Sequence, residues 1–349
     1  MQITFFSLLM SVIWSSALII LNHICRKKPF FIREFGVTNL LCLYLFSMIR
    51  MMVPYEFSFA RILPATGAFN SLHKSVYIDK MGFMQMSFLS ILAVVWMGVA
   101  ATLVLRFIFR YRRAAKEFAS YAIREDEQCR RIFNCIVNES GIQAKINIRR
   151  SKHIHIPMGV GIFHKSILLP DEDYDDTELY YILRHEFTHF KNHDLVIKIL
   201  IHIFCCIYWW NPMVYLLKKD MAQALEIKCD LDVTDSMEDR DKAEYLATIV
   251  TVLRSAGKRR RAKAFYGATA LVAGNYEMEV IERFKLVSDS CVHNDRNRLL
   301  CVSWIAACMM LMFVSYAFAI HPDHEEPRTV QVQVKETENE PCIIGNIIY

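Results

Sequence analysis

Five consecutive residues, His185-Glu186-Phe187-Thr188-His189, carry the clearest chemistry in this sequence. They lie in an apolar run with helical periodicity, and residues four apart share one face of a helix, so both imidazoles can bind one metal ion. Glu186 follows the first imidazole and can take a proton from a water that the metal activates. The spacing therefore predicts one Zn²⁺ ion, bound by His185 and His189, with Glu186 as the catalytic base. An ordinary amphipathic helix with two surface histidines is the alternative interpretation.

A zinc site of this kind takes a further carboxylate ligand from a second helix. A second segment with helical spacing, 220–230, contains Glu226, which we predict to be that ligand. Asp220, Asp232 and Glu238 compete with it on charge alone. Cys229 is a soft donor on the same helix, although a cysteine in this position is more often a small buried residue.

Imidazole ligands usually donate their second N–H group to a carboxylate, which fixes the tautomer of the ring. Asp230 lies one turn after Glu226, and Asp194 follows His189 by five residues, so both are predicted to support the ligands from behind. The acidic stretch 171–177 precedes the motif helix, where capping residues and negative charge stabilise the helix N-terminus. A calcium site is the alternative for this stretch, but it lacks the spacing of a calcium-binding loop.

The composition indicates a membrane protein. The 349 residues are 54% hydrophobic and 22% charged, with a mean hydropathy of +0.22. The net charge of +5 is modest, and the basic residues lie beside apolar runs, which argues against direct binding of nucleic acid. The eleven cysteines include no Cys-x-x-Cys pair, so no disulfide framework is expected.

Four apolar runs are long enough to span a bilayer, at about 3–24, 35–53, 83–109 and 299–320. Basic residues flank them at 26–28, 110–113 and 296–298, and such residues mark cytoplasmic ends. Both termini are then extracellular. A signal peptide is the alternative for the first run, but basic residues follow it and none precedes it.

The topology divides the chain into a membrane region at 1–110, a cytoplasmic domain at 111–298, a fourth span at 299–320 and a short extracellular tail at 321–349. Within the cytoplasmic domain we expect a helix at 114–136, strands at 146–148 and within 154–169, and the motif helix. The apolar run 195–210 is short for a span, and we expect a helix that packs in the protein or enters one leaflet and breaks at Asn211-Pro212. The expected fold is a mostly α membrane protein with a cytoplasmic α+β domain.

Several motifs together resemble the BlaR/MecR family of bacterial membrane metallopeptidases. They are Arg-His-Glu-Phe-Thr-His followed by Asp194, Tyr-Trp-Trp-Asn-Pro-Met-Val-Tyr, Glu-Ile-Lys-Cys-Asp, Gly161 to Pro170, Tyr266-Gly-Ala-Thr269 and Ile281-Glu-Arg-Phe284. With the four spans, the resemblance covers nearly all of residues 1–320. It implies a gluzincin-like zinc endopeptidase domain in which His185, His189 and Glu226 bind zinc and Glu186 is the catalytic acid and base.

The resemblance implies a regulatory protease in signal transduction that cleaves a protein substrate, such as a winged-helix repressor, or itself. Relatives that sense β-lactams carry a large extracellular penicillin-binding domain after the fourth span, whereas only about twenty-nine residues follow here, without a Ser-x-x-Lys motif. The resemblance therefore predicts a separate sensor protein or another input. A housekeeping membrane protease and a non-catalytic receptor are the competing functions, and a homodimer is left open.

Three further expectations concern single segments. The basic run 258–261 either contacts anionic membrane lipids, is a self-cleavage site or is a solvated loop. The segment 154–169 could bind the substrate backbone as an edge strand. His193, Tyr245 and Tyr266 are candidates for a second oxyanion donor, and His202 is expected to be a packing residue.

Overall fold

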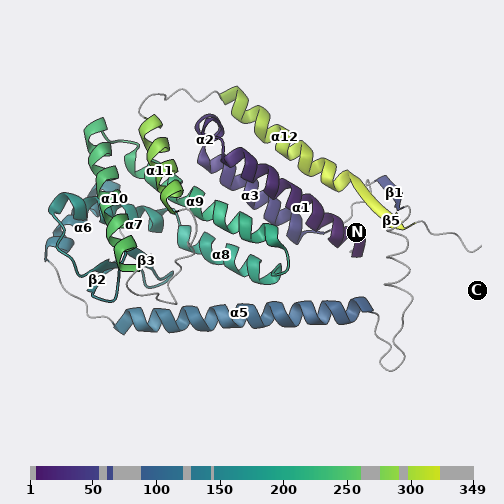
Figure 1. Ribbon diagram of the computed structural model, residues 1–349, viewed down its shortest axis with the longest axis horizontal. Coiled ribbons are helices and arrows are strands. Elements are labelled where there is room, and N and C mark those ends of the chain that lie inside the picture. Colours follow the sequence, from purple (N-terminus) through teal and green to yellow (C-terminus); the bar gives the residue numbers. More distant parts are fainter. Residues whose placement is uncertain are drawn as a thin grey trace, which may run out of the picture.

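The computed structural model describes residues 5–54, 61–65, 88–120, 127–142, 145–260, 276–290 and 298–322. The protein is mostly helical and elongated, with long apolar helices at one end and helices packed on a small sheet at the other (Figure 1). The helices are α1 Phe5–Arg26, α2 Pro29–Phe35, α3 Val37–Met52, α5 Phe88–Ser120, α6 Glu127–Ser140, α7 Asp176–Lys191, α8 Asp194–Ile207, α9 Pro212–Thr234, α10 Asp239–Arg260, α11 Tyr276–Ser290 and α12 Arg298–Ala317. The strands are β1 Arg61–Ala65, β2 Asn147–Ser151, β3 Met158–Val160, β4 Ser166–Pro170 and β5 Phe318–Pro322.

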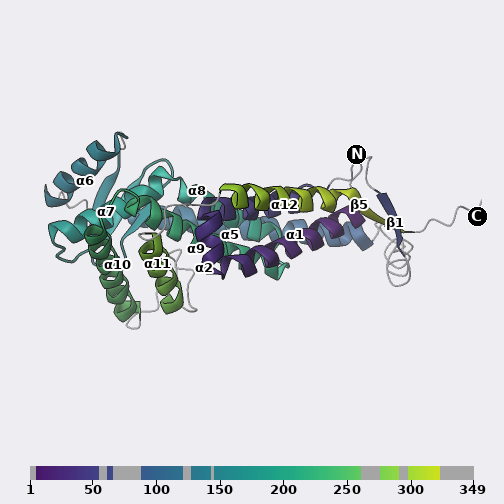
Figure 2. The same cartoon turned by 90° about the horizontal axis from the view of Figure 1, so that it is seen from above.

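Each of the four predicted spans falls on a helix, and two of these helices are long and apolar enough to cross a membrane. These two are α1, over Ser7–Arg26, and α5, over Ser90–Phe118. The apolar parts of α3 and α12 are shorter, at Val37–Met52 and Val302–Ala317. Figure 2 shows α1 and α12 side by side, with one end of each next to the strands β1 and β5.

The predicted boundaries were wrong at two of these helices. The helix α12 ends at Ala317, and β5 follows it and pairs in parallel with β1, a strand inside the predicted loop 54–82. An apolar run does not distinguish the end of a helix from a short strand, and the partner strand is distant in sequence. The predicted helix 114–136 falls on two described helices, because α5 continues through the basic residues 110–113 to Ser120 and α6 begins at Glu127, with residues 121–126 outside the described part of the chain.

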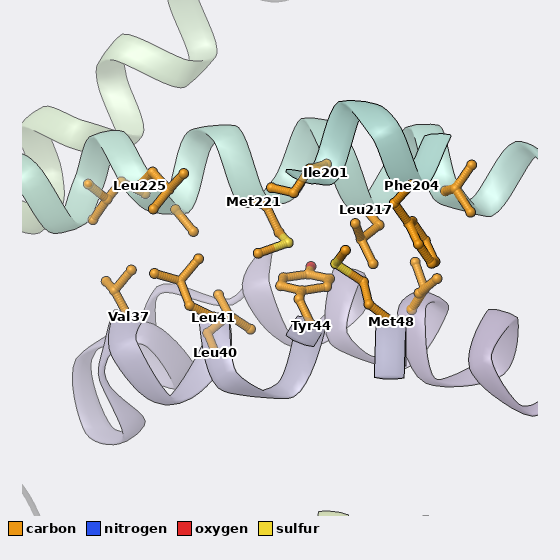
Figure 3. Packing of buried hydrophobic residues seen from close by; sticks show 14 of the residues in the cluster. Val37, Leu40, Leu41, Tyr44, Met48, Ile201, Phe204, Leu217, Met221 and Leu225 are labelled. Carbon is orange, nitrogen blue, oxygen red and sulfur yellow. The ribbon is translucent and has the colours of Figure 1, made fainter. Parts of the chain in front are cut away.

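The apolar end is held together by α1, α3, α8 and α9. Val37, Leu41 and Tyr44 of α3 face Ile201 of α8 and Met221 of α9 across a buried layer (Figure 3). The run 195–210 thus forms the helix α8, whose Ile201 and Phe204 pack in this layer, and its entry into one leaflet stays a prediction. The predicted break after it is confirmed, because the Asn211 side chain accepts a 2.9 Å hydrogen bond from the Met213 amide and caps α9, which begins with a proline.

The predicted strands form a three-stranded sheet in the order β2-β4-β3. The central strand β4 is buried, pairs in parallel with β2 and antiparallel with β3, and packs Ile167 and Leu169 against α6 and α7. The acidic stretch before α7 caps the helix as predicted: Asp175 and Glu178 each accept a hydrogen bond from the backbone amide of the other. The sheet and this cap fix the position of the helix that carries the His-Glu-x-x-His residues.

Candidate metal centre

The two histidines of the motif meet at one point. His185 and His189 lie one turn apart on α7, and their Nε2 atoms are 3.2 Å apart with the rings nearly perpendicular. His185 is buried and His189 is mostly covered. Two imidazole nitrogens at this distance can share one metal ion.

Glu226 completes a triangle of ligand atoms. It lies on α9, and its Oε2 atom is 3.7 Å from Nε2 of His185 and 3.6 Å from Nε2 of His189. A tetrahedral zinc ion with ligand distances of about 2.0–2.1 Å would separate its ligand atoms by about 3.3–3.4 Å. The three side chains therefore fit a zinc ion with little movement.

Hydrogen bonds on the far side of each ring favour the tautomer that a metal requires. Nδ1 of His189 lies 2.6 Å from Oδ2 of Asp194, and Nδ1 of His185 lies 2.8 Å from the hydroxyl of Tyr245. That hydroxyl donates to Oδ1 of Asp230 over 2.7 Å and so accepts from the ring. In the neutral form that a metal requires, with the proton of each ring on Nδ1, the lone pairs of both Nε2 atoms would point to the common site.

The electrostatics around the triangle favour positive charge at the imidazoles. Burial disfavours the imidazolium form of His185, but Cys229 and Glu226 outweigh burial and raise the pKa of His185 to about 10. Burial also disfavours the carboxylate of Glu226, yet Lys198 and the imidazoles hold its pKa well below the usual range. Negative charge thus persists beside the Nε2 atoms, where a divalent cation can be bound.

Two cations, Lys198 and Arg283, also contact the carboxylate of Glu226. Nζ of Lys198, on α8, donates to Oε1 over 3.0 Å, and a terminal nitrogen of Arg283, on α11, lies 3.6 Å from Oε2. Arg283 also holds Asp230 through two hydrogen bonds of 2.6 and 2.8 Å. This bidentate pair fixes both the carboxylate behind His185 and the orientation of Glu226.

The predicted base, Glu186, lies beside the edge strand of the sheet. Its Oε2 atom accepts a 2.7 Å hydrogen bond from the amide of Gly159 in β3. A β-carbon at Gly159 would lie 2.9 Å from the ring of Phe190, so the glycine lets the strand approach α7 closely. The open edge of β3 and the carboxylate of Glu186 thus face one another.

Cys229 offers a second set of three ligand atoms with the same two histidines. Its Sγ atom is 3.7 Å from Nδ1 of His185 and donates to the carbonyl of His185 over 3.4 Å. Cys229 thus approaches the Nδ1 side of His185, where Tyr245 also lies, and it interacts with His189 as well, whereas Glu226 lies on the Nε2 side of both rings. Glu226, at 3.6–3.7 Å from both Nε2 atoms, and Cys229 are thus the two candidates for the third ligand.

The competing residues lie elsewhere. Asp220 is buried among α1, α3 and α9, Asp232 pairs with Lys228, and Glu238 is exposed. His202 stacks on Phe107 and contacts Lys218, as expected of a packing residue. Of the oxyanion candidates, His193 is exposed before α8, Tyr245 lies behind His185, and Tyr266 is outside the described residues.

Three residues of the site escaped the sequence reasoning in their present roles. The sequence predicts no role for Lys198 in the apolar run 195–210, Tyr245 is predicted only as an oxyanion donor, and Arg283 enters only as part of a motif. A charged residue in an otherwise apolar helix, as at Lys198, is the signal that indicates a buried partner. The tyrosine and the arginine carry no comparable local signal.

Two imidazoles one turn apart on a buried helix, with a glutamate directly after the first of them in sequence, define the His-Glu-x-x-His class of metal sites. The family model described as BlaR1 peptidase M56 matches residues 4–287. The chain belongs to this family of metallopeptidases.

Curated relatives agree with this assignment. The methicillin resistance mecR1 protein of Staphylococcus aureus (strain Mu50) is 27% identical over 191 residues, which are 53% of this chain and 31% of that protein. The regulatory protein BlaR1 of Bacillus licheniformis is 24% identical over 177 residues, which are 50% of this chain and 29% of that protein. The matched part is thus less than a third of the length of either relative.

Proposed function

We propose that the protein is an integral-membrane zinc endopeptidase that hydrolyses peptide bonds on the cytoplasmic side of the membrane. One observation carries the proposal: Nε2 of His185, Nε2 of His189 and Oε2 of Glu226 form a triangle with sides of 3.2–3.7 Å. Membership of a metallopeptidase family supports the choice of reaction. His185, His189 and Glu226 would hold one zinc ion, with Asp194 and Asp230 as their outer partners.

The mechanism assigns a role to each nearby group. Zinc would act as a Lewis acid that makes a water molecule acidic and polarises the scissile carbonyl. Glu186 accepts the proton of the attacking water and donates it to the leaving amine. The amide of Gly159 now donates a hydrogen bond to Glu186. This amide and the open edge of β3 would bind the substrate as an added strand. The substrate backbone would then run past Glu186.

We propose a regulatory role for this activity, in the control of a transcriptional repressor by cleavage of the repressor or of the protease itself. The support is that a relative is named a regulatory protein and others are named for methicillin resistance. Cleavage on the cytoplasmic side follows from the proposed topology, in which four spans carry basic residues at their inner ends. A separate sensor protein would supply the signal.

The test compares the detergent-solubilised full chain with Glu186→Ala. We expect one bound zinc ion in each protein, and fragments of the chain or of a co-expressed winged-helix repressor with the wild type only. The matched control is Glu238→Ala, an exposed carboxylate, which should behave like the wild type. Absence of zinc from both proteins would refute the ligand assignment, and fragments that persist in Glu186→Ala would refute the role of the base.

A further inference from the structure

A buried carboxylate ties the end of a membrane-length helix to α9. Asp220 of α9 is completely buried, and its oxygens lie 2.8 Å from the hydroxyl of Tyr44, 3.1 Å from Nε of Arg26 and 2.7 Å from Nδ1 of His23. Burial of a charge is costly unless such partners compensate it. The last turn of α1, which contains His23 and Arg26, is therefore held at a defined position.

Arg26 also binds α11. Its terminal nitrogen lies 3.2 and 3.1 Å from the two carboxylate oxygens of Glu282, and Gln223 of α9 donates to the same carboxylate. Through Glu282, α11 contacts both α1 and α9, and Figure 1 shows α11 beside α9. The position of α11 thus depends on the end of α1.

The next residue of α11 binds the metal centre. Arg283 holds Asp230 with both of its contacting nitrogens, and a third nitrogen lies 3.6 Å from Oε2 of Glu226. Asp230 in turn accepts the hydrogen bond of Tyr245, whose hydroxyl lies 2.8 Å from Nδ1 of His185. Successive residues of a helix point about 100° apart, so 282 and 283 reach two different neighbours from one turn.

We propose that Glu282 and Arg283 are positioning residues that couple the end of α1 to the metal centre. Arg26 sets the position of α11 through Glu282, and Arg283 then sets Asp230 and Glu226. A displacement of α1 relative to α9 would therefore loosen both Glu226 and Asp230, the carboxylate that supports His185. This inference rests on the proposed metal-binding role of His185, His189 and Glu226.

The coupling is measured with cobalt(II), which reports both affinity and ligand geometry through its visible spectrum. In the full chain in detergent, Arg283→Ala should weaken cobalt binding about 10- to 100-fold, as expected for an outer partner of a ligand. Arg26→Gln and Glu282→Gln should each weaken it roughly 2- to 30-fold. Arg283→Lys, which keeps the charge without the bidentate geometry, should recover part of the affinity.

The double variant of Arg26 and Glu282 separates coupling from general destabilisation. Because both substitutions break the contact between Arg26 and Glu282, their effects should not add. The double variant should bind cobalt no more weakly than whichever single variant has the lower cobalt affinity. The matched control is Arg50→Gln, which removes a buried arginine that bonds Ser315 between α3 and α12 and should leave the cobalt spectrum unchanged.

Two results overturn the inference alone: wild-type affinity and spectrum in Arg26→Gln and Glu282→Gln, or an equal loss of affinity in Arg50→Gln. Failure of the wild type to bind cobalt or zinc would overturn the proposed function, and this inference with it.

Discussion

Replacement of Tyr245 by phenylalanine removes one oxygen atom from the support of His185. The hydroxyl is fully buried and bridges Nδ1 of His185, at 2.8 Å, and Oδ1 of Asp230, at 2.7 Å. Without it the ring and the carboxylate are 3.5 Å apart, longer than a normal hydrogen bond of about 2.9 Å. Asp230 keeps its two hydrogen bonds to Arg283, so the principal loss falls on the orientation of His185.

Loss of such an outer partner weakens metal binding about 10- to 100-fold, which corresponds to about 1.4–2.7 kcal/mol. We expect Tyr245→Phe to show this loss when zinc is titrated against a competing chelator in detergent. The free energy of unfolding should fall by about 1–2 kcal/mol, because one buried hydrogen-bond donor is lost without a cavity.

The matched control is Tyr181→Phe. The ring of Tyr181 packs edge-on against Tyr245 at 5.8 Å, and its hydroxyl lies outside the hydrogen bonds to His185. Zinc affinity within twofold of the wild type in Tyr245→Phe, or an equal loss in Tyr181→Phe, would refute the positioning role.

Three further predictions test other parts of the site. Glu226→Gln should weaken cobalt binding by more than the roughly 100-fold loss that is typical of an outer partner, whereas Cys229→Ser should weaken it by less than about 10-fold. The reverse order of the two losses, with a sulfur-to-cobalt absorption band in the wild type, would make Cys229 the third ligand. Gly159→Ala should lower the free energy of unfolding by about 1–3 kcal/mol, because the added methyl group would lie 2.9 Å from the ring of Phe190; thermal unfolding measures this, Gly159→Ala with Phe190→Leu should regain part of the loss, and unchanged stability would contradict the close approach. Asp175→Ala should lower the free energy of unfolding by about 1 kcal/mol, because the cap of α7 is lost. Zinc affinity should not change, since the cap lies at the start of the helix and the histidines lie toward its end. A loss of zinc would show that the cap also positions the ligands.

The apolar helices were predictable to within a few residues in most places, because a long apolar run has few alternatives to a helix. The errors occurred where the sequence offers no stop signal. Arg110 to Arg113 are acceptable in a helix, so α5 continues through them to Ser120. The pairing of β1 with β5 joins residues near 61 to residues near 318, and no local pattern indicates such a pair.

Several predicted segments lie wholly or partly outside the described residues. They include most of the loop 54–82, the residues 261–269 that contain Arg261 and Tyr266, and the tail from 323. The roles suggested for the basic run 258–261 therefore stay predictions.

The sequence by itself determined what depends on spacing within one helix. His185 and His189 share a face because they are four residues apart, and the same regularity puts Glu226 and Asp230 on one side of α9. Asp175 and Glu178 form a cap for the same local reason.

Only the tertiary structure decided which of several carboxylates meets the imidazoles. Asp220 and Glu226 are six residues apart on α9, yet the first meets the end of α1 and the second meets α7. It also brought Tyr245 and Arg283 from α10 and α11 to the ligands. The physical reason is that contacts between helices depend on packing angles and on which faces are buried, and these are set by all the helices together rather than by the spacing within any one of them.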